Sequence, residues 1–262
     1  MGTLTRRSLF ACACCGVLAQ PRAAAAGQDS GAPQALELGT TGMARIAPTV
    51  WIARIAPDLL LYTSTAVIDG GIFYPANGLV LERDDSAVLI DTTYSPEQAS
   101  ILLAWCAQHS RPIALAIATH FHSDRTGGIP ALRQAGIRTL AHPLTCELAR
   151  QRGLPVPEPI TEFSADHHDI GPDLQLYAPG SAHTRDNIVA WCPRQQTLFG
   201  GCMIKSATSP GLGNIADAVL RDWPASARRV RARYPAARCV VPGHGTIAGD
   251  PIETTLSLLA RS

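Results

Sequence analysis

The sequence contains almost no lysine. Lys205 is the only lysine among 22 basic residues, and the others are arginines. The 21 acidic residues leave a formal net charge of +1 at pH 7, so no excess of basic side chains is available to attract nucleic acid or an acidic membrane surface. We therefore expect no nucleic-acid partner, and the single lysine is conspicuous.

Long apolar runs, flexible linkers and repeats are lacking as well. The apolar run near the N-terminus, from Leu9 to Ala19, is too short to span a bilayer. No Gly/Ser-rich linker and no repeat of solenoid period divides the 262 residues. Since 46% of the residues are hydrophobic, the chain can bury a sizeable core. These features predict a single globular domain after the N-terminal segment.

The first residues are typical of a targeting signal. Thr5-Arg6-Arg7-Ser8-Leu9-Phe10 resembles a twin-arginine export signal, and Ala23 to Ala26 form a small-residue cleavage region. The arginine pair disfavours a core helix, and the nearby cysteines lack the small-residue context of a lipoprotein signal. We predict a signal peptide at residues 1–26, a mature domain at residues 27–262, location in the periplasm and no membrane contact after cleavage.

The cysteines do not form a disulfide framework. Of the eight cysteines, those beyond the signal are odd in number and irregularly spaced: Cys106, Cys146, Cys192, Cys202 and Cys239. Most of them lie in apolar segments and are predicted to be small core residues. Cys202 differs because Gly200 and Gly201 precede it, and glycine lets a backbone approach another group closely.

Two histidines and a carboxylate follow an apolar segment at alternate positions. Ile113 to Ala118 is typical of a buried parallel strand, and His120, His122 and Asp124 come directly after it. Imidazole nitrogen and carboxylate oxygen are ligands that zinc takes in catalytic sites. An isolated His-x-His is more often part of a surface turn, so the zinc interpretation depends on ligands elsewhere in the chain.

Further zinc-type side chains occur at other strand-to-loop boundaries. His183 lies in Pro179-Gly-Ser-Ala-His183, Cys202 follows Leu198-Phe-Gly-Gly201, and His244 lies in Val241-Pro-Gly-His244. Each alone is explained as a turn. A ligand type after four separate strands is hard to explain by chance, and it predicts a metal site where the strands end.

Strand and helix patterns alternate along the mature chain. A β-rich opening up to Ile90 and a second β-rich block from Leu174 to Phe199 are each followed by helices, which predicts two sheets packed face to face with helices outside. Turns are expected at Asp69 to Gly71 and at Pro75 to Gly78. A helix capped by Ser95 is expected from Pro96 to about Ser110. Further helices are expected over Asp124 to Ala135, Pro143 to Gln151, Asp217 to Tyr234 with a new start at Pro224, and Pro251 to Ala260.

From about Val50 to Ala260 the chain resembles the metallo-β-lactamase superfamily, and within it the two-zinc β-lactamases with a cysteine ligand. Besides the ligand motifs, the resemblance rests on Asn77-Gly78, Ile90-Asp91-Thr92, His183 to Asn187, Gly200 to Lys205, Leu212-Gly213-Asn214, Asp217-Ala218, Trp223-Pro224 and Val241 to Gly245. It implies an α/β fold, the αββα four-layer sandwich, with the metal ions at the sheet edges.

The resemblance also implies two Zn²⁺ ions per chain. One would be held by His120, His122 and His183, and the other by Asp124, Cys202 and His244. Thioesterases, lactonases and nucleases of the superfamily usually have a second histidine after the motif's aspartate, where this chain has Arg125. Single-zinc β-lactamases replace the first histidine with asparagine. This chain has Arg125 in place of the second histidine and keeps the first histidine, His120. Both features favour the two-zinc subclass with a cysteine ligand, which is the B1-like subclass.

The implied activity is that of a zinc-dependent β-lactamase, which opens the lactam ring of penicillins, cephalosporins and carbapenems by zinc-bound hydroxide and confers antibiotic resistance. Asp124 would orient the hydroxide and relay its proton, and Asn214 would help to hold the oxyanion. Lys205 and Asn214 would contact the substrate, with Lys205 binding its carboxylate. Phe73 would contact it from a flap formed by Ile68 to Asn77.

The role of Asp91 and the function each have an alternative interpretation. Asp91 is expected to hydrogen-bond a ligand histidine from behind, with a turn or capping role as the alternative. A zinc-binding or redox protein without hydrolysis and a non-lactam hydrolase of the same fold are the alternative functions. Three protein ligands per ion leave positions open for water, unlike closed structural zinc cages, so hydrolysis is favoured. The partner is then a small β-lactam, and a monomer is expected.

Overall fold

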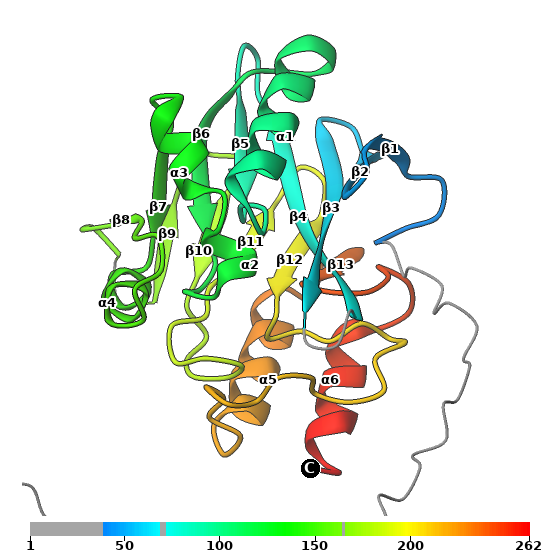
Figure 1. Ribbon diagram of the computed structural model, residues 1–262. Coiled ribbons are helices and arrows are strands. Elements are labelled where there is room, and N and C mark those ends of the chain that lie inside the picture. The colour runs from blue at the N-terminus through cyan, green and yellow to red at the C-terminus, as the bar shows by residue number, and fades with distance from the viewer. Residues whose placement is uncertain (1–38, 69–71, 164–165) are drawn as a thin grey trace, which may run out of the picture. The chain divides into compact units, whose positions relative to one another are not determined.

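Two β-sheets form the centre of this computed structural model, which describes residues 39–68, 72–163 and 166–262 (Figure 1). Within these residues, the larger sheet has the strand order β1 to β8. Its strands are β1 (Ala44–Ala47), β2 (Val50–Ala56), β3 (Leu59–Ile68), β4 (Ile72–Glu82), β5 (Ala87–Ile90), β6 (Ile113–Ala118), β7 (Arg138–Ala141) and β8 (Glu158–Pro159).

The smaller sheet has the order β13-β12-β11-β10-β9 over the same described residues. Its strands are β9 (His167–Asp169), β10 (Gln175–Tyr177), β11 (Val189–Cys192), β12 (Thr197–Gly201) and β13 (Cys239–Pro242). The helices are α1 (Pro96–His109), α2 (Ser123–Thr126), α3 (Ile129–Gln134), α4 (Pro143–Gln151), α5 (Trp223–Arg233) and α6 (Pro251–Leu259). None of the described helices is long and apolar enough to cross a membrane.

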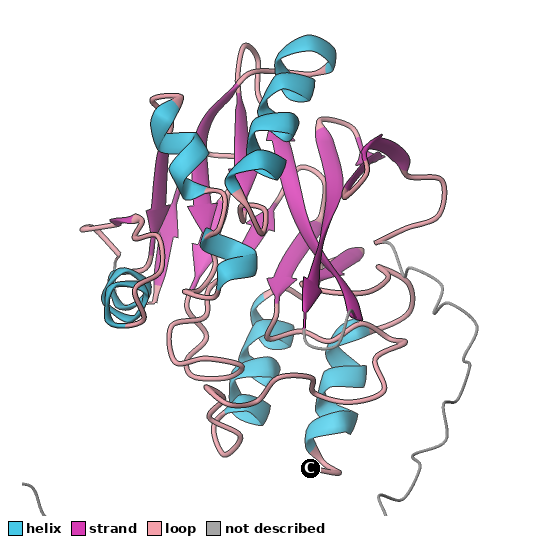
Figure 2. Ribbon diagram, viewed as in Figure 1, coloured by secondary structure: helices cyan, strands magenta, loops and turns pink. Residues whose placement is uncertain are grey.

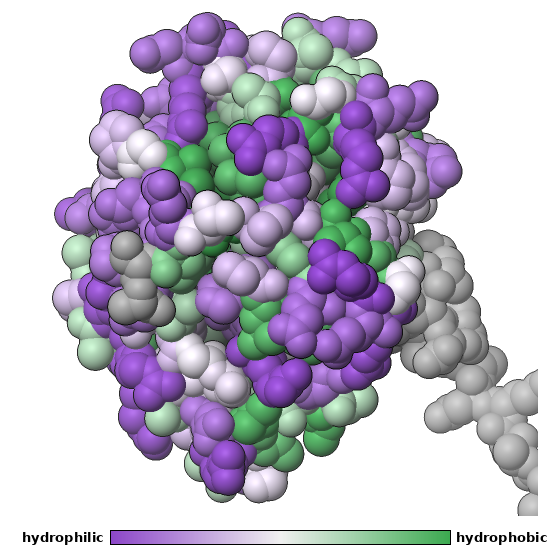
Figure 3. All heavy atoms as spheres, turned by 90° about the vertical axis from the view of Figure 1, so that its left-hand side faces the viewer, coloured by the Kyte–Doolittle hydropathy of each residue, from purple (hydrophilic) through white to green (hydrophobic). Residues whose placement is uncertain are grey.

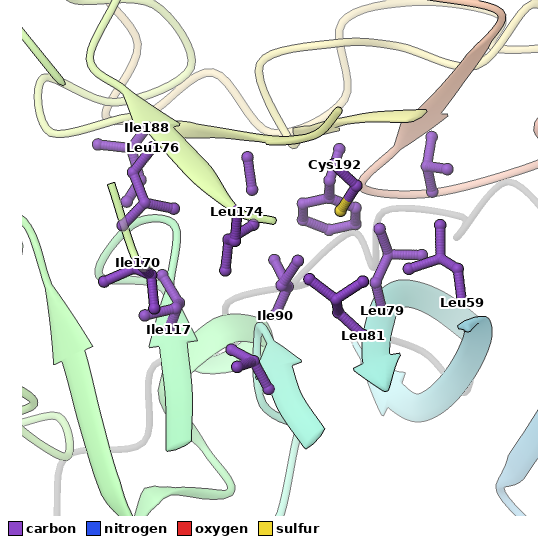
Figure 4. Close-up of a cluster of buried hydrophobic side chains, with 14 of the residues drawn as sticks. Leu59, Leu79, Leu81, Ile90, Ile117, Ile170, Leu174, Leu176, Ile188 and Cys192 are labelled. Carbon is purple, nitrogen blue, oxygen red and sulfur yellow. The ribbon is translucent and has the colours of Figure 1, made fainter. Parts of the chain in front are cut away.

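Alternation along the strands sends apolar side chains to both faces of each sheet. In β3, Leu59 and Leu61 belong to the central cluster between the sheets, whereas Leu60 and Tyr62 belong to the cluster beneath α1. Figure 4 shows side chains of the larger sheet, such as Leu79, facing those of the smaller sheet. The central apolar layer therefore joins the two sheets.

The outer face of each sheet is covered by helices (Figure 2). Leu102 and Cys106 of α1 pack on the larger sheet, and Trp223 and Val230 of α5 pack on the smaller sheet together with α6. Helix, sheet, sheet and helix give the four layers of the predicted αββα sandwich. Because most apolar side chains lie in these interior layers, the face of the molecule in Figure 3 is largely hydrophilic, with small hydrophobic patches among the hydrophilic residues.

Two predicted helices were too long. The helix expected from Asp124 to Ala135 is broken into α2 and α3 at Gly127, where a Cβ would lie 2.1 Å from the carbonyl oxygen of Tyr94. The helix expected from Asp217 begins only at Trp223, next to the predicted start at Pro224. Before it, Val219 donates its N–H to the carbonyl of Ala182 rather than to a helical turn.

The turn predicted at Pro75 to Gly78 is wrong, because these residues lie inside β4. They continue the antiparallel pairing with β3, in which Tyr62 opposes Gly78 and Thr65 opposes Pro75. A Cβ on Gly78 would lie 2.3 Å from the Tyr62 ring, so glycine is needed there for close packing. Long-range pairing thus overrides a local turn pattern.

Some expectations fall outside the described residues. These are the signal peptide at 1–26, the turn at Asp69 to Gly71 and the side chain of Phe73, whose backbone lies in β4. The proposed flap therefore stays a prediction, although β3 and β4 pair from Leu59–Leu81 up to Ile68–Ile72.

Candidate metal centre

The predicted ligands lie where strands of both sheets end. His120 follows β6 of the larger sheet, and His183, Cys202 and His244 follow β10, β12 and β13 of the smaller sheet. Since β10 and β12 are both antiparallel to β11, and β13 is parallel to β12, these three strands end at the same edge. The Ile188 N–H donates to the Thr119 carbonyl across 2.9 Å, which joins this edge to the end of β6.

Three imidazoles form the first cluster. His122 Nδ1 lies 3.1 Å from His120 Nε2 and 3.1 Å from His183 Nε2. In a tetrahedral site with Zn–N distances near 2.0–2.1 Å, ligand nitrogens are about 3.3 Å apart. The three nitrogens thus have the spacing needed to hold a zinc ion.

Asp124, Cys202 and His244 form the second cluster. His244 Nε2 lies 3.2 Å from both Asp124 Oδ2 and Cys202 Sγ, and the sulfur lies 3.4 Å from the same oxygen. His120, Asp124 and Cys202 also have donor atoms within 4.8 Å of one another, so the two clusters adjoin. The structure therefore brings together all six predicted ligands.

Hydrogen bonds to the outer ring nitrogens orient two of the histidines. His122 Nε2 lies 3.0 Å from Asp217 Oδ2, and His244 Nδ1 lies 2.8 Å from the carbonyl oxygen of Pro75. A carboxylate or carbonyl can only accept, so these nitrogens carry the protons and donate. His122 Nδ1 and His244 Nε2 are then left with free lone pairs for a metal.

The protonation of the donor groups also suits metal binding. Burial lowers the pKa of His120 and His183 well below the usual histidine value, and it lowers that of His244. Burial alone would raise the pKa of Asp124, but the positive charge of Arg125 is the largest of several opposing effects, which together hold the pKa well below its usual range. The imidazoles of these three histidines are therefore neutral and the Asp124 carboxylate is ionised, as ligands must be.

Arg125 fills the space behind the second cluster, and its side chain is fully buried. Its Nη2 lies 2.8 Å from Asp124 Oδ2 and donates to Cys202 Sγ across 3.0 Å. The same group donates to the carbonyl of Gly243, while Nη1 donates to the carbonyl of Asn77. Burial raises the pKa of the Cys202 thiol and Arg125 opposes that rise, so the guanidinium favours the thiolate that a metal needs.

The expected role of Asp91 is wrong. Its carboxylate accepts from the backbone N–H and the hydroxyl of Thr119, at 2.7 and 2.9 Å, and from Nη1 of Arg125 at 2.9 Å. It therefore steadies the residue before His120 and neutralises the buried arginine, and it does not bond a ligand histidine. A buried cation requires a buried anion beside it, and this pairing depends on contacts distant in sequence.

A cavity of about 530 Å³ opens over both clusters and is lined by donor groups of each. Lys205 lines it and is buried, with Nζ 5.3 Å from the centroid of the Trp223 ring. Lys205 is therefore not a solvated surface residue. Asn214 is exposed at the same cavity, and its Oδ1 accepts from the N–H of Ala216 across 3.0 Å. Its amide N–H groups are then the ones that can face a substrate.

Several other residues of this cavity had no individual role predicted from the sequence, among them Tyr94, Arg152 and Asp217, and Tyr74 was included only in the predicted flap. Tyr74 packs on His244 with 4.4 Å between ring centroids, and burial raises the pKa of its hydroxyl to about 12. Asp217 was part of a recognised motif, but only the structure shows its contact with His122. Arg152 had no sequence signal at all.

Comparison with known proteins agrees with this fold and site. Residues 71–244 match the family model of the metallo-beta-lactamase superfamily. The chain is 36% identical over 210 residues to a metallo-beta-lactamase type 2 of Bacteroides fragilis, covering 79% of this chain and 84% of the relative. It is 34% identical over 219 residues to one of Bacillus cereus, covering 82% and 80%. The chain belongs to the metallo-beta-lactamase superfamily.

Solved structures give the same result. The metallo-beta-lactamase FIM-1 from Pseudomonas aeruginosa, in its mono-zinc form, superposes with a TM-score of 0.78 at 35% identity, over 81% of this chain and 96% of that one. A metallo-beta-lactamase from Erythrobacter litoralis gives 0.79 at 35% identity, over 84% and 100%. These matches confirm the predicted metallo-β-lactamase fold.

Proposed function

We propose that the protein is a zinc-dependent β-lactamase that opens the lactam ring of penicillins, cephalosporins and carbapenems, and so confers antibiotic resistance. The observation that carries this proposal is the pair of adjoining donor clusters beneath a cavity that also presents Lys205. The relatives named above are β-lactamases, and this chain has the groups that such a reaction requires.

Two Zn²⁺ ions per chain fit the donors. His120, His122 and His183 would hold one ion, and Asp124, Cys202 and His244 the other. The nitrogen spacing of the first cluster and the mixed nitrogen, oxygen and sulfur donors of the second are both acceptable to zinc. Zinc bound there supplies a water of lowered pKa and a Lewis acid for the carbonyl oxygen.

The protein's own side chains bind and orient the substrate. Lys205, as a buried cation at the cavity, binds the carboxylate that β-lactams carry. Asn214 donates from Nδ2 to the oxygen that becomes negative during attack on the carbonyl. Asp124 orients the attacking water and relays its proton, and Phe73 contacts the substrate from the flap.

Hydrolysis of nitrocefin by purified, zinc-loaded protein tests the proposal. Turnover that is abolished by a chelator and restored by zinc is expected. Zinc binding without turnover of any β-lactam would instead indicate a structural or redox site, and turnover of other esters or lactones alone would indicate a non-lactam hydrolase.

The cellular setting forms part of the proposal. The Thr5-Arg6-Arg7-Ser8-Leu9-Phe10 start supports export by the twin-arginine route to the periplasm, where β-lactams meet their targets. That route carries folded proteins, which suits a domain that loads metal on a reduced thiolate. The mature protein would act as a monomer without membrane contact.

A further inference from the structure

Arg152 lines the cavity next to the three-histidine cluster. It follows α4, and its Nη2 donates to Asp217 Oδ1, while the other oxygen of Asp217 accepts from His122. Its guanidinium carbon lies 5.6 Å from the centroid of the Phe121 ring. Phe121 stands between His120 and His122 in the sequence. An ion pair and a cation–π contact therefore hold this cation at the metal centre.

Most of the hydrogen-bonding capacity of Arg152 is unused. A guanidinium has five N–H donors, and Asp217 is the one described residue to which the Arg152 side chain donates. The side chain is 57% exposed, so the remaining donors are accessible to a ligand. Both oxygens of Asp217 already accept hydrogen bonds, one from Arg152 and one from His122, and the Arg152 guanidinium balances its negative charge.

The chemistry of a β-lactam shows what could occupy this position. The carboxylate is attached on the nitrogen side of the lactam, and the acylamino side chain is attached on the carbonyl side. Lys205 is three residues after Cys202 and suits the ring carboxylate. Arg152 adjoins the other cluster, through Asp217 and His122, where the carbonyl side of the substrate would lie.

We propose that Arg152 forms a second anion-binding subsite, which recognises β-lactams with a negative charge on the acyl side chain. This inference rests on the proposed function and adds a substrate class to it. The cavity would then hold a dianionic substrate between two cations, Arg152 and Lys205. The other charged groups at the cavity are Asp124, which is paired with Arg125, and Asp217, which is paired with Arg152.

Benzylpenicillin and carbenicillin provide the test, since they differ by one carboxylate on the acyl side chain. Arg152→Gln should lower kcat/KM for carbenicillin relative to benzylpenicillin by about two- to fivefold, the size expected for a partly exposed ion pair. Arg152→Lys should restore part of the ratio. Arg150→Gln is the matched control, because Arg150 is exposed, lies two residues away and does not line the cavity.

Two further measurements separate substrate binding from an effect through Asp217 and His122. Zinc content under chelator competition should be the same in Arg152→Gln as in the unaltered protein. Added salt should reduce the carbenicillin preference of the unaltered protein and leave that of Arg152→Gln unchanged. An equal loss for both penicillins, or an unchanged ratio, would overturn the subsite. Failure of the unaltered protein to hydrolyse both penicillins and nitrocefin would instead refute the proposed function itself.

Discussion

Nη2 of Arg125 donates a hydrogen bond to the sulfur of Cys202 across 3.0 Å, and both side chains are buried. The residue after Asp124 is therefore not a further metal ligand but a fixed positive charge. The charge offsets Asp91, Asp124 and a Cys202 thiolate at the same time. Arg125 thus contacts two ligands of the second cluster, Cys202 and Asp124, from the buried side and is not itself a metal ligand.

Removing that cation should destabilise the protein. Arg125→Met leaves Asp91 buried without its partner, and uncompensated buried charges cost about 3–5 kcal/mol. We expect the free energy of unfolding from urea titration to fall by that order. Arg228→Met, at an exposed position with no ion pair to any described residue, should change it by less than about 0.5 kcal/mol. Equal stability of the two variants would contradict this account.

Cys202→Ser should remove one zinc ion selectively. A hydroxyl replaces a thiolate in the second cluster, while the three imidazoles of the first cluster are unchanged. Metal analysis after gel filtration should show one tightly held zinc in the variant and two in the unaltered protein. Cys239→Ser, a half-buried thiol outside both clusters, should retain two. If Cys202→Ser also retains two, the ligand assignment is wrong.

Lys205→Ala should weaken substrate binding. Charge-assisted hydrogen bonds contribute on the order of 1.5–3 kcal/mol, so kcat/KM for a cephalosporin should fall roughly ten- to a hundredfold. Most of the loss should appear in KM if the contact is equal in ground and transition states. Lys205→Arg should recover only part of the lost kcat/KM, because the planar guanidinium of arginine places its donors differently from the lysine ammonium. Unchanged kinetics in Lys205→Ala would place the carboxylate elsewhere.

Gly127→Ala should destabilise the loop that carries the histidine motif. The added Cβ would lie 2.1 Å from the Tyr94 carbonyl oxygen, and overpacking of this kind costs about 1–3 kcal/mol. Gly211→Ala is the control, since a Cβ there has no heavy atom within 4 Å. Thermal unfolding should show a lower Tm for the first variant and no decrease for the second.

Export should depend on the paired arginines of the signal. A chain with Arg6→Lys and Arg7→Lys should accumulate in the cytoplasm as precursor, which cell fractionation and immunoblotting can measure. Arg22→Lys, between the apolar run and the alanines, serves as the control and should be exported. A normal periplasmic yield of the double variant would mean that another route carries the protein.

The positions of most secondary elements could be predicted from local sequence. Ile113–Ala118 and Pro143–Gln151 have the predicted bounds, and Ser95 caps α1 as expected, accepting from the N–H of Gln98. Apolar periodicity, capping residues and proline act within a few residues, so a single sequence reveals them. The six ligands were recognisable for the same reason, since they come after four separate strands.

The tertiary structure alone decided which of these local pieces meet. Pro75 to Gly78 became strand because β3 pairs with them, and Asp91 turned to Arg125 and Thr119 rather than to a histidine. Arg152 and Asp217 are 65 residues apart in the chain, so no local pattern indicates their ion pair. Such contacts form only when the two sheets pack and desolvate the groups between them, because burial makes each unpaired charge costly and selects its partner.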